Sequence, residues 1–112
     1  MRSIILTGPD GVRFEADVPE TRRERARGLL GRQRLAPGRA MLIPNARSVH
    51  TIGMRFPIDA AFLDRDLVVL TVKRLVPGRV AVPRLRARHV LECAAGAGPS
   101  PGQPLRPTSG TL

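Results

Sequence analysis

The sequence predicts a mainly β domain of the α+β class, in which antiparallel hairpins form a sheet with one short helix packed on it. Three observations support this prediction. Apolar and polar residues alternate over 12–18, two apolar runs flank a turn within 58–75, and residues 21–24 carry a helix-start signal. The chain has 112 residues, 42% of them hydrophobic but only 3% aromatic, so aliphatic side chains must build one modest core.

Turn residues between apolar segments indicate where the strands lie. Gly8-Pro9-Asp10-Gly11 separates residues 4–6 from 12–18 and predicts a hairpin with one solvent-facing side. Asp64-Arg65-Asp66 separates 58–63 from 67–75 and predicts a second hairpin with both strands buried. Shorter strands are expected at 41–43, at 48–54 and at 88–93.

The single helix is predicted from a capping box. In Thr21-Arg22-Arg23-Glu24, the Thr hydroxyl and the Glu carboxylate are spaced to accept from each other's backbone N–H groups. Ala26, Leu29 and Leu30 then fall on one helical face, and Gly31 is placed to end the helix. We therefore expect a short helix that contacts the sheet through this narrow apolar stripe.

The composition changes after residue 96. Residues 1–96 read as a single β-rich domain, whereas 97–112 are rich in Pro and Gly and offer little apolar surface to bury. This tail is expected to be loose, with at most a short strand at 103–105.

The charge is strongly positive, with 19 basic against 9 acidic residues and a formal net charge of +10. Such a charge attracts polyanions whatever the fold. The aromatic residues that stack on single strands are scarce, and no helix-turn-helix or zinc-finger spacing occurs. A specific nucleic-acid role is therefore not predicted, although nonspecific binding driven by charge stays open.

Cys93 is the only cysteine, which excludes an intrachain disulfide and argues against a cysteine-based zinc site. The first ten residues hold only three consecutive large apolar side chains, too few for a signal-peptide core. No apolar run approaches the length of a transmembrane segment. We expect a cytoplasmic protein without a membrane span.

Three side chains form the cluster that is best suited to catalysis or metal binding. His50 and Met54 share one face of the expected 48–54 strand, and a bend at Pro57 can bring Asp59 toward them. A His with a carboxylate can act as an acid–base pair, and a His with a thioether can hold a soft metal. The same residues also fit purely structural roles. No phosphate-binding loop, nucleophile elbow or dinucleotide motif accompanies them.

Several segments together resemble the domain of unknown function 192 family of bacteria and archaea. They are Arg27-Gly28-Leu29-Leu30-Gly31-Arg32, Met41-Leu42-Ile43, His50-Thr51-Ile52-Gly53-Met54-Arg55-Phe56-Pro57-Ile58-Asp59, Ala61-Phe62-Leu63-Asp64 and Val90-Leu91-Glu92. The resemblance implies a barrel-like β domain with a short helix, and it carries no reaction, cofactor or catalytic residue. Arg27, His50, Met54 and Asp59 fill polar positions of these motifs and are the candidate binding residues.

These observations favour a non-enzymatic binding or accessory protein. Its groove near residues 50–59 would hold a small anion, a peptide or a partner protein. The first alternative is a small enzyme or metal carrier that uses His50 with Asp59 or Met54; the second is the nonspecific nucleic-acid binder. No catalytic residue, metal ligand or cofactor is assigned.

Overall fold

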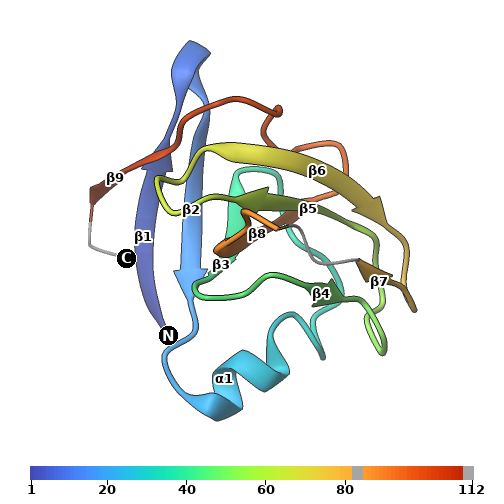
Figure 1. Ribbon diagram of the computed structural model, residues 1–112. Coiled ribbons are helices and arrows are strands. Elements are labelled where there is room, and N and C mark those ends of the chain that lie inside the picture. The colour runs from blue at the N-terminus through green and yellow to red at the C-terminus, as the bar shows by residue number, and fades with distance from the viewer. Residues whose placement is uncertain (82–84, 110–112) are drawn as a thin grey trace.

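The computed structural model describes residues 1–81 and 85–109, and this part of the chain is mainly β. Seven strands form one sheet in the order β6-β5-β8-β3-β2-β1-β9, and β4 pairs with β7 beside it (Figure 1). The strands are β1 Arg2–Thr7, β2 Arg13–Val18, β3 Arg39–Ile43, β4 Val49–His50, β5 Ile58–Leu63, β6 Val69–Leu75, β7 Val80–Ala81, β8 His89–Ala94 and β9 Arg106–Ser109.

The first predicted hairpin is confirmed. β1 and β2 pair antiparallel from Arg2 opposite Val18 to Thr7 opposite Arg13, and their alternating side chains are buried on one face. A short 3-10 turn over Pro9–Gly11 joins them, with Asp10 at φ 61° and Gly11 at φ 76°. These positive angles explain why Asp and Gly occupy the turn.

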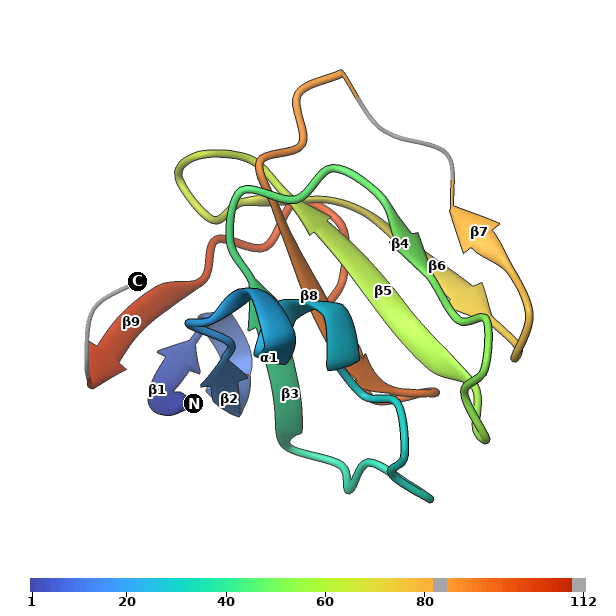
Figure 2. The same cartoon turned by 90° about the horizontal axis from the view of Figure 1, so that it is seen from below.

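The capping box is also confirmed. The Glu24 backbone N–H donates to Thr21 Oγ1 (3.0 Å), and the Thr21 N–H donates to Glu24 Oε1 (3.2 Å). The helix α1, however, spans only Arg22–Arg27, because Gly28 leaves helical geometry at φ 49°. Viewed from below, α1 crosses in front of β3 and β8 (Figure 2). Its own residues stay out of the core, and Leu29, just beyond it, is the buried contact.

The route through α1 makes one strand pair parallel, which corrects the all-antiparallel expectation. β2 and β3 pair from Glu15 opposite Arg39 to Asp17 opposite Met41, running in the same direction. A parallel pair needs a long crossover connection, and residues 19–38 with α1 supply it.

The strands β5 and β8 pair along their whole length and are buried on both faces. One face packs in a core with β1 and β2, through residues such as Ala61, Leu91 and Cys93. The other face packs on the α1 side, through Ala60 and Val90 among others. A polar side chain on either strand therefore loses most of its contact with water.

The expected strand over 48–54 is wrong in extent, because β4 ends at His50. Thr51 is fully buried, and its hydroxyl donates to the Val76 carbonyl (2.7 Å) while accepting from the Arg79 N–H (2.9 Å). The chain then turns at Gly53, with φ 84°. These bonds pull residues 51–54 away from strand geometry.

The expected barrel is not confirmed. Among the described residues, the outer strands β6 and β9 do not pair with each other, so the sheet remains open. The C-terminal segment differs from the expected loose tail: the Val69 N–H donates to the Gln103 carbonyl, and the Leu105 N–H donates to Leu67. Leu105 is buried at 3% exposure, and β9 pairs with β1. The buried Leu105 side chain, these backbone hydrogen bonds and the pairing with the edge of β1 together order this Pro-rich segment.

No helix within residues 1–81 and 85–109 is long and apolar enough to cross a membrane.

Candidate functional site

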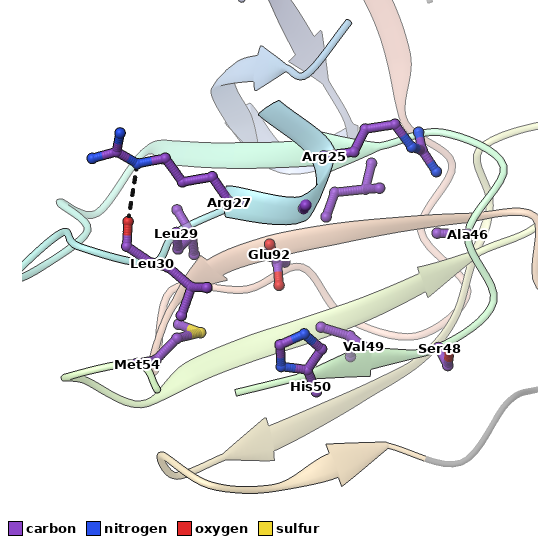
Figure 3. Close-up of a pocket in the computed structure, with 13 residues that line it drawn as sticks. Arg25, Arg27, Leu29, Leu30, Ala46, Ser48, Val49, His50, Met54 and Glu92 are labelled. Atoms are coloured by element: carbon purple, nitrogen blue, oxygen red, sulfur yellow. Dashed lines mark hydrogen bonds between the residues drawn. The ribbon is translucent and has the colours of Figure 1, made fainter. Parts of the chain in front are cut away.

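A pocket of about 350 Å³ lies between α1 with its following turn, β4 and β8 (Figure 3). Its walls are mostly apolar, and its polar side chains come from three different elements. The lining residues are Arg25, Ala26, Arg27, Gly28, Leu29, Leu30, Ile43, Ala46, Ser48, Val49, His50, Met54 and Glu92.

Glu92 is the most deeply placed polar group of this pocket. It lies in the middle of β8, where Met41 of β3 and Ala60 of β5 are its register partners. Because paired residues share a sheet face, its nearest cross-strand neighbours are both apolar. Only 3% of Glu92 is exposed. The strands thus hold a carboxyl group where it has lost almost all of its water.

No hydrogen bond or ion pair is made by the Glu92 carboxyl to any residue in the described ranges. In these residues, every completely enclosed side-chain oxygen has a hydrogen-bond partner. The Glu92 oxygens have none, so they are not completely enclosed and reach the pocket space. Burial raises the pKa of Glu92 from its ordinary value of 4.5 to about 7, since desolvation disfavours the ionised form. The carboxyl group thus faces the pocket without a partner in the described part of the chain.

His50 stands at the rim of the pocket opposite Glu92 (Figure 3). Its side chain is exposed, and its Nδ1 accepts a hydrogen bond from the Ile52 backbone N–H (3.2 Å). With Nδ1 accepting, the neutral imidazole carries its proton on Nε2. His50 is thereby set to donate from Nε2, whereas a metal ligand or a general base there would need a free lone pair.

Met54 forms a further part of the pocket wall. It is buried at 8% exposure, and its N–H donates to the Thr51 carbonyl (3.1 Å) within the turn after β4. A Cβ on Gly53 would lie 3.3 Å from a Leu30 methyl carbon, so this turn packs closely against the turn after α1. The apolar walls are therefore fixed by two turns from distant parts of the chain.

Arg25 and Arg27 lie at the outer edge, and both guanidinium groups have backbone partners. Arg25 Nη1 donates to the Pro44 carbonyl (2.8 Å), and Arg27 Nε donates to the Leu30 carbonyl (3.4 Å). Figure 3 shows the two side chains pointing to opposite sides, away from Glu92. Neither arginine forms an ion pair with Glu92. They frame the opening rather than converge on its centre.

Asp59 is not part of this pocket. Its carboxylate accepts from Arg74 Nε, from the Gly96 N–H (2.9 Å) and from the Gly98 N–H (3.3 Å). Arg74 is its register partner on β6. Asp59 therefore anchors the chain after β8, and the expected approach of Asp59 to His50 is not formed. Of the four candidates, the structure brings together Arg27, His50 and Met54.

His89 and Cys93, the other titratable side chains on β8, have structural roles. His89 Nδ1 accepts from the Asn45 N–H (3.1 Å), and burial lowers its pKa, with Arg88 adding to the effect. Cys93 is fully buried, and burial raises the pKa of its thiol. Such a thiol stays protonated and unreactive.

Residues 1–81 and 85–109 contain no group of three or more His, Cys, Asp or Glu side chains placed to hold a metal ion. The described residues give the pocket one carboxyl group and one imidazole, and the imidazole already uses Nδ1. Its chemistry is that of a small, mostly apolar cavity with a buried acid at its floor and a hydrogen-bond donor at its rim.

Fold and site thus define a small mainly β domain with a surface pocket built around a buried carboxyl group. The chain belongs to the domain of unknown function 192 family (DUF192, Uncharacterized ACR), whose model matches residues 5–100. It is 39% identical over 49 residues to the UPF0127 protein PH1112 of Pyrococcus horikoshii, a match that spans 44% of this chain and 43% of that relative.

Two crystal structures share the fold at 24% identity. A protein of unknown function from Novosphingobium aromaticivorans aligns with a TM-score of 0.75 over 93% of this chain and 83% of its own. A candidate transcription regulator from Sinorhizobium meliloti 1021 aligns with a TM-score of 0.76 over 94% of this chain and 92% of its own. At this identity the similarity establishes the fold alone.

Glu92 is the site residue that sequence reasoning missed. Two signals pointed to it. It is the only charged residue in the otherwise apolar segment 90–94, and it belongs to the Val90-Leu91-Glu92 motif of the family resemblance. A carboxyl group inside a strand with two buried faces needs a structural or functional explanation.

Proposed function

We propose that this domain is a non-enzymatic binding protein whose ligand occupies the pocket above Glu92. The observation that carries the proposal is the buried Glu92 carboxyl group, which has no partner among the described residues and opens into an apolar cavity. Buried polar groups are almost always hydrogen-bonded in native proteins. A ligand that supplies the missing partner explains why an acid occupies this position.

The dimensions of the pocket suit a small molecule or one peptide side chain. Its volume of about 350 Å³ lies at the lower end of the range of ligand sites, and apolar walls with a few polar groups are typical of them. His50 supplies a donor at the rim, opposite the acid at the floor. The arrangement can hold a ligand by its apolar body and orient it by two polar contacts.

Binding is favoured over catalysis by the surroundings of Glu92. A raised carboxyl pKa in a pocket also occurs in acid–base catalysts, and many of these act together with a nucleophile or a second acid–base group. Within the described residues no such group contacts Glu92, and Asp59 is held elsewhere by Arg74. The similarity to a candidate transcription regulator supports no nucleic-acid role here, since it extends only to the fold.

The proposal is tested by NMR of the protein labelled with ¹³C at its methionine methyl groups. Of the three methionines, Met54 lines the pocket, whereas Met1 lies exposed at the N-terminus and serves as the internal reference. A library of small apolar compounds bearing one polar group is screened. We expect some compounds to shift the Met54 methyl signal in a saturable manner and to leave Met1 unchanged.

A matched pair of variants shows whether the pocket is responsible. Ala46→Leu places a larger side chain in the lining, whereas Ala95→Leu makes the same change at an exposed position away from it. Ala46→Leu should weaken binding at least tenfold, and Ala95→Leu should bind as the wild type does. A Met54 methyl signal that responds to no compound, or that responds equally in both variants, would overturn the proposal.

A further inference from the structure

We infer that the ligand of this pocket is an apolar amine, whose ammonium group pairs with Glu92 while its hydrocarbon part lies against the walls. This inference rests on the proposed function and specifies its ligand class. It is carried by the position of Glu92, 3% exposed and the one acidic side chain among the described lining residues, at the floor of a pocket whose walls are otherwise mainly apolar.

The chemistry of the Glu92 surroundings favours a positively charged partner. An ionised carboxylate only accepts hydrogen bonds, and an ammonium group provides up to three donors. The cross-strand neighbours Met41 and Ala60 provide none from their side chains. A buried carboxylate without a partner is costly, whereas one paired with a hydrogen-bonded cation is compensated. An amine that enters the pocket therefore supplies both the charge and the donors that are missing.

The basic residues at the rim do not provide this partner. The guanidinium groups of Arg25 and Arg27 bond the carbonyls of Pro44 and Leu30. Both side chains are exposed, so their charges are solvated. The net charge of +10 opposes the approach of a cation at long range, but at physiological ionic strength this repulsion is screened beyond about 8 Å. Contact with Glu92, which is 3% exposed, is screened much less.

The walls select for a hydrocarbon body. Leu29 and Val49 are buried, Leu30 and Ile43 are partly buried, and all four line the pocket together with Met54. Each methylene group that leaves water against such a surface adds favourable free energy. A simple alkylamine should therefore bind more tightly than ammonium itself.

The pH dependence of binding follows from the groups around Glu92. The titratable and charged side chains lining the pocket are Arg25 and Arg27 from α1 and His50 from β4. On the sheet face of Glu92, Lys73 of β6 lies opposite Ala60 and Asp17 of β2 lies opposite Met41, each two strands away, while Asp59 of β5 lies on the other face. Burial raises the pKa of Glu92 to about 7, and an alkylammonium stays protonated to well above pH 8. The ionised fraction of Glu92, and with it the affinity for an amine, should rise about tenfold from pH 6 to pH 8.

The experiment measures the affinities of three probes of the same chain length: pentylamine, pentan-1-ol and pentanoate. Binding to the full chain is followed by the Met54 methyl signal and by calorimetry at pH 6, 7 and 8. We expect pentylamine to bind at least tenfold more tightly than the other two at pH 8. The affinity for pentylamine should increase with pH, and that for pentan-1-ol should stay constant.

Glu92→Gln is the decisive variant, because it keeps the size of the side chain and removes the charge. It should reduce the affinity for pentylamine at least tenfold at pH 8 and abolish the pH dependence. A cooperative urea unfolding transition of the variant shows that it is folded. If Glu92→Gln loses its fold, the pH dependence of the wild type still decides the question.

Several results would overturn the inference. Preferential binding of pentanoate, with an affinity that falls as the pH rises, would mean that protonated Glu92 donates to an anion. Absence of pentylamine binding, while other compounds shift the Met54 signal, would refute the amine and leave the proposed function standing. No response of Met54 to any probe or library compound would refute both.

Discussion

Glu92 and Asp59 lie on neighbouring strands, one register position apart, and face opposite sides of the sheet. Glu92 is opposite Ala60, and Asp59 is opposite Cys93. Asp59 has Arg74 and two backbone N–H groups as partners, whereas Glu92 has no partner within the described residues. The two carboxyl groups are similarly buried but differ in their surroundings. Asp59 anchors the chain after β8, whereas Glu92 faces the pocket.

The first prediction concerns the pH dependence of stability. The pKa of Glu92 is raised to about 7 in the folded state, so the folded protein holds this proton more tightly than the unfolded chain does. The stabilising contribution is therefore present at low pH and is lost as the pH rises from about 4.5 to 7. Between pH 5 and pH 8, the free energy of unfolding should fall by about 2 to 3 kcal/mol from this group.

Glu92→Gln isolates that contribution, because the amide does not titrate. Urea unfolding of both proteins at pH 5 and pH 8 measures their free energies of unfolding. From pH 5 to pH 8, the free energy of unfolding of the variant should rise by about 2 to 3 kcal/mol relative to that of the wild type. A difference between the two proteins that is the same at both pH values would show that Glu92 is solvated or paired.

Asp59 should be important for stability rather than for binding. Asp59→Asn keeps the shape of the side chain but removes the negative charge to which Arg74 and the N–H groups of Gly96 and Gly98 donate hydrogen bonds. We expect a loss of about 1 to 3 kcal/mol in the free energy of unfolding. Asp66→Asn is the matched control, since Asp66 is exposed and its pair with Arg65 spans 4.0 Å. It should change stability by less than about 0.5 kcal/mol. Equal effects of the two substitutions would contradict the anchoring role.

The sequence predicted the local elements well where short-range chemistry determines them. The capping box of Thr21 and Glu24, the turn at Asp10 and the alternation in β2 depend on residues within a few positions of each other. The 48–54 strand was wrong because Thr51 bonds Val76 and Arg79, which lie 25 and 28 positions away. Local patterns do not report such long-range bonds.

The C-terminal segment illustrates the same limit and leads to a third prediction. Its composition indicated a loose tail, yet Leu105 is buried in the core with Leu67 and Val69. Leu105→Ala should therefore cost about 2 to 4 kcal/mol. The melting temperature should drop by on the order of 10 °C, as measured by thermal unfolding. Leu85→Ala, at a side chain that is 89% exposed, should change it by about 2 °C or less. Similar melting temperatures for the two variants would show that Leu105 is dispensable.

Any nucleic-acid binding should be electrostatic, since the net charge of +10 is the feature that favours it. Its affinity should fall steeply between about 50 and 200 mM salt and should not depend on sequence. Fluorescence anisotropy with a labelled duplex and scrambled competitors measures both. A preference of more than about a hundredfold for one sequence at physiological salt would contradict this prediction.

The candidate site was predictable only in part. His50, Met54 and Arg27 were recognised because they are close in sequence or belong to the family motifs, and they do line one pocket. Asp59 was assigned to the wrong surroundings, because its partners Arg74, Gly96 and Gly98 come from β6 and from the chain after β8. The burial of Glu92 depends on β8 being covered on both faces, which the sheet order determines.

The most direct test of the account is the titration of the Glu92 side-chain carboxyl carbon by ¹³C NMR, with and without saturating pentylamine. In the free protein the midpoint should lie near pH 7, because the carboxyl group is buried without a partner. Pentylamine should lower it by one unit or more, since a bound cation stabilises the ionised form. A free-protein midpoint near the ordinary value of 4.5, unchanged by pentylamine, would contradict the account.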